Sequence, residues 1–155
     1  MPIAGPRLIH GTAIALDGRA ALIRGESGSG KSDLALRCIA QPPSDLVCGQ
    51  ALLIADDQVL ADVRGGKIHL TCPDSIKGLL EVRGLGIIAV PTRNEAELEL
   101  LVDLVPRNEV ERLPDPNARA ELMGVEIRRL AVAAFEASAP LKLLLALQGA
   151  AGAGL

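Results

Sequence analysis

Short apolar blocks separated by turn residues dominate the first half of the chain. Residues 12–16 (TAIAL) and 19–23 (RAALI) flank Asp17-Gly18, and Asp-Gly between two such runs is a strong β-hairpin signal. Residues 59–63 and 67–72 flank a pair of adjacent glycines in the same way. The pattern therefore predicts two antiparallel hairpins.

Two segments have the spacing of amphipathic or buried helices. In residues 31–40 the apolar side chains recur at helical intervals, and two prolines follow the segment. A second helix is expected over residues 141–147. Ser138 suits its N-cap, Pro140 suits its first turn and Gly149 ends it.

The remaining apolar blocks predict further strands. Residues 51–55 (ALLIA) form a continuous apolar run, which is typical of a strand buried on both faces. Residues 98–104 alternate between apolar and other side chains with period two, and residues 86–90 and 125–133 are also strand-like. Pro73-Asp74 is expected to open a helix that continues to about Leu80.

Composition narrows the classes of protein to consider. The 155 residues predict a single domain over residues 1–155, and 49% of them are hydrophobic although the only aromatic residue is Phe135. A net charge of −3 argues against a nucleic-acid partner. No apolar stretch approaches the ~20 residues of a membrane span, and three cysteines at unrelated spacings are typical of reduced thiols in the cytoplasm.

A glycine-rich loop follows the second predicted strand and precedes the first predicted helix. It matches the pattern G-x-x-x-x-G-K-[ST]. Its eight residues are Gly25, Glu26, Ser27, Gly28, Ser29, Gly30, Lys31 and Ser32. In such a loop the backbone N–H groups surround phosphates, the lysine reaches the β- and γ-phosphates, and the final hydroxyl binds Mg²⁺. The loop predicts that the chain binds ATP with Mg²⁺.

Two adjacent carboxylates, Asp56 and Asp57, follow the apolar run at residues 51–55. An apolar strand that ends in an acidic residue is the Walker B arrangement, in which the carboxylate addresses Mg²⁺. The neighbouring carboxylate could accept a proton from an attacking hydroxyl. A strand–P-loop–helix unit with a Walker-B-like strand predicts an α/β fold, and the hairpins indicate a mixed sheet.

Two further features leave their roles open when they are taken alone. His10 lies near the loop end of the sheet if the first two strands pair, but an isolated histidine is usually structural. Glu81 and Arg83 stand before two glycines and an apolar strand (EVRGLGII, residues 81–88), and the end of a helix explains this stretch equally well.

The motifs together resemble one known family. His10-Gly11, the glycine-rich loop, Asp56-Asp57 and the E-x-R-G-x-G stretch occur together in this order. This combination resembles the catalytic domain of the HPr kinase/phosphorylase family, over roughly residues 8–112. The resemblance implies an ATP-dependent kinase that phosphorylates a serine of the phosphocarrier HPr in phosphotransferase-system regulation. It also implies a fold like that of phosphoenolpyruvate carboxykinase nucleotide domains, and a homohexamer.

The resemblance also implies roles for individual residues. Asp57 would take the proton from the target serine and return it in the reverse direction, with His10 as the active-site histidine beside it. The other implied catalytic residues are Lys31, Arg83 and Arg112. The implied metal ligands are Ser32, Asp56 and Glu81, with Asp56 either supporting the metal or orienting Asp57.

The chain departs from the family pattern at both ends. It begins a few residues before His10, which resembles short forms that consist of the catalytic domain alone. The family's C-terminal segment linked to dephosphorylation has no clear counterpart, and residues 127–130 and 135–140 stand in its place. Kinase activity is therefore expected, and dephosphorylation by phosphorolysis is left open. The alternatives are a small-molecule P-loop kinase, with residues 107–119 as its lid, and a nucleotide-binding regulator.

Overall fold

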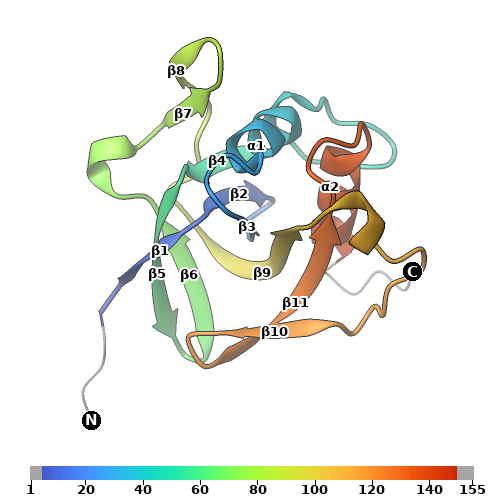
Figure 1. Cartoon of the computed structure of the whole chain (residues 1–155). Helices are drawn as coiled ribbons and strands as arrows, with labels where there is room; N and C mark the ends of the chain where they lie inside the picture. Colours follow the sequence, from blue (N-terminus) through green and yellow to red (C-terminus); the bar gives the residue numbers. More distant parts are fainter. Residues whose placement is uncertain (1–4, 150–155) are drawn as a thin grey trace.

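A computed structural model of the chain describes residues 5–149 (Figure 1). Its elements, including two 3-10 turns η1 and η2, are β1 (Arg7–His10), β2 (Thr12–Leu16), β3 (Arg19–Arg24), α1 (Lys31–Ala40), β4 (Leu52–Ala55), β5 (Gln58–Arg64), β6 (Lys67–Thr71), η1 (Asp74–Ile76), β7 (Leu79–Val82), β8 (Gly86–Ala89), β9 (Glu95–Leu104), η2 (Arg107–Glu109), β10 (Arg119–Leu122), β11 (Val125–Val132) and α2 (Ala139–Gly149).

The main sheet is mixed, and the predicted α/β class is confirmed. Its strands follow the order β1-β5-β6-β9-β3-β2-β4, and β11 pairs with β9 while β10 pairs with β11. β3 and β11 both run parallel to β9, whereas β2 is antiparallel to both β3 and β4. β3, β4, β9 and β11 therefore point the same way, so the loops that follow them open at one edge of the sheet.

The two faces of the sheet are buried in different ways. On one face, α1 and α2 lie against the sheet and against each other, and they enclose a cluster that includes Ile23, Leu34, Leu100 and Leu143 (Figure 1). On the other face the sheet curls, so that β5 and β6 help to enclose a second cluster that includes Leu22. Burial on both faces explains why the central strands β2, β3 and β4 are almost continuously apolar.

The turns explain the strand pairing. At the first hairpin Asp17 and Gly18 have φ of 52° and 80°, and positive φ at both central residues defines the turn that suits the twist of a hairpin. The predicted β5–β6 hairpin is also confirmed, with two glycines at its turn. A third hairpin, β10–β11, turns at Met123-Gly124 and was not predicted, because Met-Gly carries no strong turn signal.

One predicted element is wrong. The helix expected from Pro73 to about Leu80 is only the short turn η1, after which the chain enters β7. Gly78 has a φ of 78° and ends the turn, and its carbonyl accepts a hydrogen bond from Val90 N at 3.0 Å. Leu79 and Leu80 then pair with β8. Cross-strand pairing thus overrides the helical start signal of the proline.

The described residues contain no helix long and apolar enough to cross a bilayer. The three cysteines are free, and Cys38 lies in the core between α1 and the sheet. Burial raises the pKa of the Cys38 thiol to about 12, despite the opposing charge of Arg37. This thiol therefore stays protonated at neutral pH and serves as a small apolar side chain.

Candidate active site

The glycine-rich loop connects β3 to α1 at the edge where the parallel strands end. Gly28 and Gly30 have φ of 80° and 103°, values that glycine adopts without strain. Gly30 is the N-cap of α1, and no side chain caps this helix. The first amides of a helix lack intrahelical acceptors and carry partial positive charge. Ser29 Oγ is also buried without a partner among the described residues. These unpaired donors fit a phosphate chain.

Lys31 is held inside the loop. Its side chain is buried, and Nζ donates to the carbonyl oxygens of Gly25 and Glu26, both at 2.9 Å. The loop therefore fixes the ammonium next to the N-terminus of α1. A cation at this position adds a point charge to the phosphate-binding amides.

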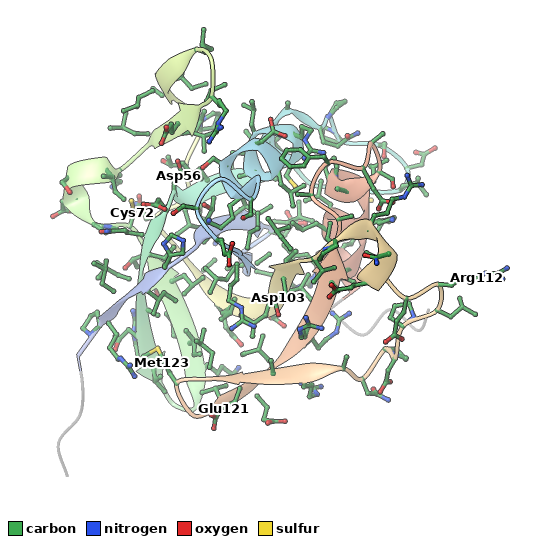
Figure 2. All side chains as sticks on the ribbon, viewed as in Figure 1. Asp56, Cys72, Asp103, Arg112, Glu121 and Met123 are labelled. Atoms are coloured by element: carbon green, nitrogen blue, oxygen red, sulfur yellow. The ribbon has the colours of Figure 1, made fainter. Side chains whose placement is uncertain are left out.

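Asp56 connects three parts of the chain. Its Oδ1 accepts hydrogen bonds from Thr12 Oγ1 at 3.0 Å and from Ser32 Oγ at 2.6 Å. Its Oδ2 accepts one from the Glu81 amide at 3.0 Å. Asp56 is only 8% exposed, and it lies at the base of the β7–β8 hairpin (Figure 2). The carboxylate thus ties β2, α1 and β7 together beside the phosphate-binding loop.

Asp57 differs from Asp56 in its exposure and in its backbone. Its side chain is 63% exposed, and its φ of 71° is unusual for a residue other than glycine. The strained backbone is held by bonds on both sides, because Gln58 N donates to Asp56 O and Asp57 N donates to Thr12 Oγ1. Strained residues of this kind cluster at functional sites. The turn presents the Asp57 carboxylate to solvent at the edge of the sheet.

His10 lies next to Asp57, as the family resemblance implied. Its Nδ1 is 3.6 Å from Asp57 Oδ1, and its side chain is half exposed. The Gly11 amide donates to Asp57 O at 3.0 Å, which ties the two segments together. A Cβ on Gly11 would lie 3.0 Å from the carbonyl oxygen of Ile23, so only glycine fits where the chain passes from β1 to β2.

The β7–β8 hairpin extends from the rest of the molecule above α1 (Figure 1). Glu81 is on β7, next to Asp56 through its amide. Arg83 begins the turn, and a Cβ on Gly28 would lie 3.8 Å from Arg83 Nη2. The hairpin therefore brings a guanidinium to the glycine-rich loop. This juxtaposition explains the E-x-R-G-x-G spacing, since the glycines form the turn after the arginine.

The donor set is compatible with Mg²⁺. No group of three or more His, Cys, Asp or Glu side chains within residues 5–149 is arranged as a metal cage. Mg²⁺ does not require such a cage, because it keeps several waters and usually takes one or two protein ligands together with substrate phosphates. Ser32 Oγ and Asp56 Oδ1, which are 2.6 Å apart, are oxygen donors of the right kind beside the phosphate-binding loop.

Comparison with known proteins agrees with this geometry. Residues 2–144 match the family model described as the HPr serine kinase C-terminal domain. The chain belongs to this family.

Curated relatives place the family match in longer proteins. The HPr kinase/phosphorylase of Bordetella pertussis is 37% identical over 139 residues, which cover 83% of this chain and 42% of the relative. The corresponding protein of Cupriavidus metallidurans is 37% identical over 142 residues, covering 84% and 41%. The chain thus spans about two fifths of the length of these relatives.

A solved structure has the same fold. The Hpr(Ser) kinase/phosphatase from Coxiella burnetii superposes with a TM-score of 0.76 at 22% sequence identity, over 92% of this chain and 89% of that one. The predicted HPr kinase fold is therefore confirmed. Within the HPr serine kinase domain, the structure brings together the P-loop, both aspartates, His10, Glu81 and Arg83.

Arg112 is the predicted site residue that the structure does not bring to this cluster. It is exposed on the segment between η2 and β10, and its side chain points away from the body of the domain, far from Asp56 (Figure 2). A catalytic role for Arg112 in this chain would require that segment to move, or a second copy to receive the side chain.

An ion cluster at the start of the P-loop has no signature in the sequence. Asp103 accepts hydrogen bonds from Arg24 Nε at 2.7 Å and Nη2 at 3.0 Å, and from Arg129 Nε at 2.6 Å. Arg24 directly precedes Gly25, so the cluster fixes the end of β3 relative to β9 and β11. The three residues are far apart in the sequence, and only the strand order brings them together.

The same cluster predicts a pH effect on stability. Burial would raise the pKa of Asp103, but hydrogen bonds from Arg24 and Arg129 outweigh it and hold the pKa below its ordinary value. The stabilisation is therefore present above about pH 4 and is lost as the pH falls through the folded-state pKa. We expect the free energy of unfolding to decline more steeply with acid in the wild type than in Asp103→Asn. At neutral pH this variant should lose about 2 kcal/mol.

Urea unfolding between pH 7 and pH 2.5 measures this effect. Asp45→Asn is a matched control, because Asp45 is exposed on the loop after α1. The Asp103 interpretation is wrong if Asp103→Asn and Asp45→Asn have the same stability and the same acid dependence.

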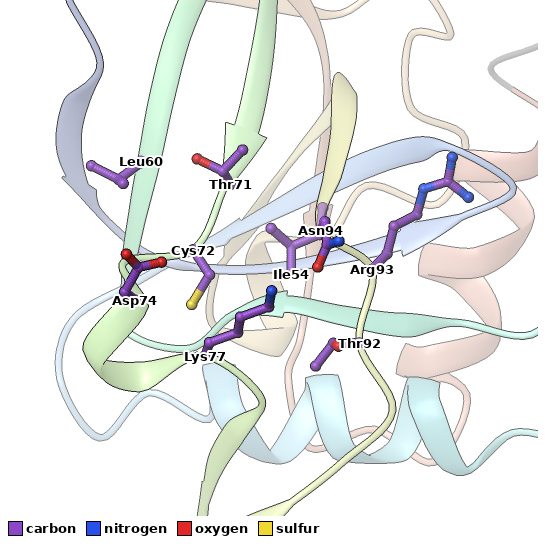
Figure 3. Close-up of a pocket in the computed structure, with 9 residues that line it drawn as sticks. All are labelled: Ile54, Leu60, Thr71, Cys72, Asp74, Lys77, Thr92, Arg93 and Asn94. Carbon is purple, nitrogen blue, oxygen red and sulfur yellow. The ribbon is translucent and has the colours of Figure 1, made fainter.

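A cavity of about 310 Å³ lies beside η1, and none of its lining residues belongs to the P-loop (Figure 3). Cys72, Asp74, Lys77 and Asn94 are among the residues that line it. Burial raises the pKa of Cys72, with Lys77 opposing the shift, so this thiol is not activated as a nucleophile. The lining has one acidic side chain, Asp74, and two basic side chains, Lys77 and Arg93, but it includes no residue of the glycine-rich loop. We therefore assign the phosphate chemistry to the P-loop.

Proposed function

We propose that this domain transfers the γ-phosphoryl group of ATP to a serine of an HPr-like phosphocarrier protein. The observation that carries the proposal is the pairing of a phosphate-binding loop with an exposed carboxylate, Asp57, whose turn is held by Thr12. A protein hydroxyl can reach an exposed base, whereas a small-molecule kinase usually encloses its substrate. The family to which the chain belongs supports the choice of HPr.

The proposed reaction is an in-line displacement. The serine oxygen forms a bond to the γ-phosphorus, the bond from that phosphorus to the β,γ-bridging oxygen breaks, and ADP leaves. Asp57 accepts the serine proton, and His10 at 3.6 Å orients the carboxylate. Lys31 and the amides of α1 stabilise the phosphate oxygens. Arg83 lies at the loop and adds a second positive charge.

Ser32 and Asp56 would hold Mg²⁺. Glu81, whose backbone amide donates to Asp56 Oδ2, would supply a further carboxylate from β7. When bound, the metal neutralises phosphate charge and orients the phosphate chain. Asp56 also accepts hydrogen bonds from Ser32 and from the Glu81 amide, which holds these residues next to one another at the proposed metal site.

We extend the proposal to assembly and location. A homo-oligomer is supported by exposed apolar side chains on β1 and on the β7–β8 hairpin, which include Leu8, Leu85 and Ile87. We propose a hexamer, the form that the family resemblance implies. Light scattering would measure its stoichiometry. Free cysteines and the use of ATP support the cytoplasm as its compartment.

The decisive test is intact-mass spectrometry of HPr after incubation with this protein and Mg-ATP. We expect a gain of one phosphoryl group on a serine, and at least about a 1,000-fold slower gain with Lys31→Met. Methionine keeps an apolar stem in this buried position, and circular dichroism would confirm that the variant is folded.

A second arm of the experiment tests phosphorolysis. Addition of inorganic phosphate to phosphorylated HPr would remove the group and form pyrophosphate if the reverse reaction operates. Absence of transfer to HPr, together with tight ATP binding, would reject the proposal in favour of a small-molecule kinase or a nucleotide-binding regulator.

A further inference from the structure

The single aromatic side chain of the protein lies exposed beside the P-loop. Phe135 is on the segment between β11 and α2, and 73% of it is exposed to solvent. A phenyl ring in water loses the large stabilisation that burial would give it. The core of the described residues is packed with aliphatic side chains instead.

The ring touches the point where the phosphate-binding helix begins. A Cβ on Gly30 would lie 2.8 Å from Phe135 Cζ and 3.1 Å from Phe135 Cε1. Gly30 is the N-cap of α1. One edge of the ring therefore rests on the backbone of the loop, and the remaining surface is open to a ligand bound there.

The segment that carries the ring is fixed from both sides. Arg37 of α1 donates to the carbonyl oxygens of Ala134 and, at 3.2 Å, Glu136. The Glu136 carboxylate accepts from Lys142 of α2 at 2.8 Å and lies 3.3 Å from Arg107. The backbone that carries Phe135 is therefore held in place before a ligand binds. This reduces the conformational entropy that the segment loses when a ligand stacks on the ring.

The strand order gives the site a direction. β11, β9, β3, β2 and β4 lie side by side in that order. The P-loop follows β3, Asp57 follows β4 on one side, and Phe135 follows β11 on the other. A nucleotide whose γ-phosphate faces Asp57 therefore extends its nucleoside towards Phe135.

We propose that Phe135 is the stacking platform for the adenine ring of ATP. The inference rests on the proposed function only in taking ATP as the ligand of the P-loop, and it does not depend on the identity of the phosphate acceptor. Every base has a π-face, so stacking contributes affinity without strong selection among bases. Arg107, which is 86% exposed next to Glu136, is positioned to contact the nucleoside from the same side.

Calorimetry with two ligands separates a nucleoside contact from a loop defect. Wild type, Phe135→Ala and Phe135→Leu are titrated with Mg-ATP and with Mg-tripolyphosphate, which has the phosphate chain but no nucleoside. We expect Phe135→Ala to bind ATP about 10- to 100-fold more weakly than the wild type does. Its affinity for tripolyphosphate should equal that of the wild type. Phe135→Leu should resemble Phe135→Ala, because leucine packs on Gly30 but cannot stack.

Phe135→Trp provides an independent signal, since the chain has no tryptophan of its own. We expect it to retain ATP affinity and its fluorescence to be quenched by ATP but not by tripolyphosphate. Leu113→Trp is the control, because Leu113 is 87% exposed on another loop, and its fluorescence should not respond to ATP.

These outcomes also separate this inference from the proposed function, because both measurements are made without HPr. The stacking proposal would be overturned if Phe135→Ala weakened the binding of ATP and of tripolyphosphate equally and Phe135→Leu restored both affinities. Phe135 would then be a residue that packs against the loop. Unchanged ATP affinity in Phe135→Ala would also overturn the stacking proposal, whether or not HPr is phosphorylated.

Discussion

Asp57→Asn is expected to slow phosphoryl transfer to HPr by about 100- to 10,000-fold while Mg-ATP affinity stays near the wild-type value. A positioned general base contributes this range of rate, and Asp57 is the exposed carboxylate at the sheet edge beside the P-loop. The loss should appear in kcat, because the carboxylate acts on the attacking hydroxyl and not on the bound nucleotide.

Asparagine is the appropriate replacement because of the backbone at this position. Asp57 has a φ of 71°, and asparagine tolerates this region better than alanine does. The variant should therefore keep the turn and the bond from its amide to Thr12 Oγ1. Asp62→Asn is a matched control, since Asp62 forms a surface ion pair with Arg64 on β5. Near-normal transfer by Asp57→Asn would exclude Asp57 as the base.

Asp56→Ala is expected to lower the free energy of unfolding by about 3 kcal/mol. It removes the acceptor for the Thr12 and Ser32 hydroxyls and for the Glu81 amide. A buried donor without an acceptor loses its hydration as well as its hydrogen bond, and Thr12 is completely buried. For a domain of this size the melting temperature should fall by about 6–12 °C.

Asp56→Asn tests the same interpretation with the shape preserved. Its side-chain NH₂ group would face groups that donate hydrogen bonds to Asp56 in the wild type. We therefore expect Asp56→Asn to recover only part of the free energy of unfolding that Asp56→Ala loses. Thermal unfolding followed by circular dichroism measures both variants, with Asp57→Asn as the exposed neighbour that should change the melting temperature little. A shift below about 2 °C for Asp56→Ala would mean that Asp56 has no structural role before metal binding.

The sequence alone determined the features that depend on a few neighbouring residues. The P-loop follows from glycine and lysine spacing, because positive φ and exposed amides are local properties of residues 25–32. The first two hairpins follow from Asp17-Gly18 and from Gly65-Gly66 for the same reason. The α1 bounds and the strand at residues 98–104 follow from apolar periodicity, which one element expresses by itself.

Contacts that depend on strand order cannot be read from the sequence and come from the tertiary packing. Thr12 meets Asp56 because β2 lies between β3 and β4, and nothing near Thr12 in the sequence indicates that contact. Phe135 reaches Gly30 because β11 joins the sheet beside β9. The β7 strand replaced the helix expected there, and Arg112 lies away from the site. Short-range patterns define loops and elements, whereas packing against distant strands selects which side chains share the active site.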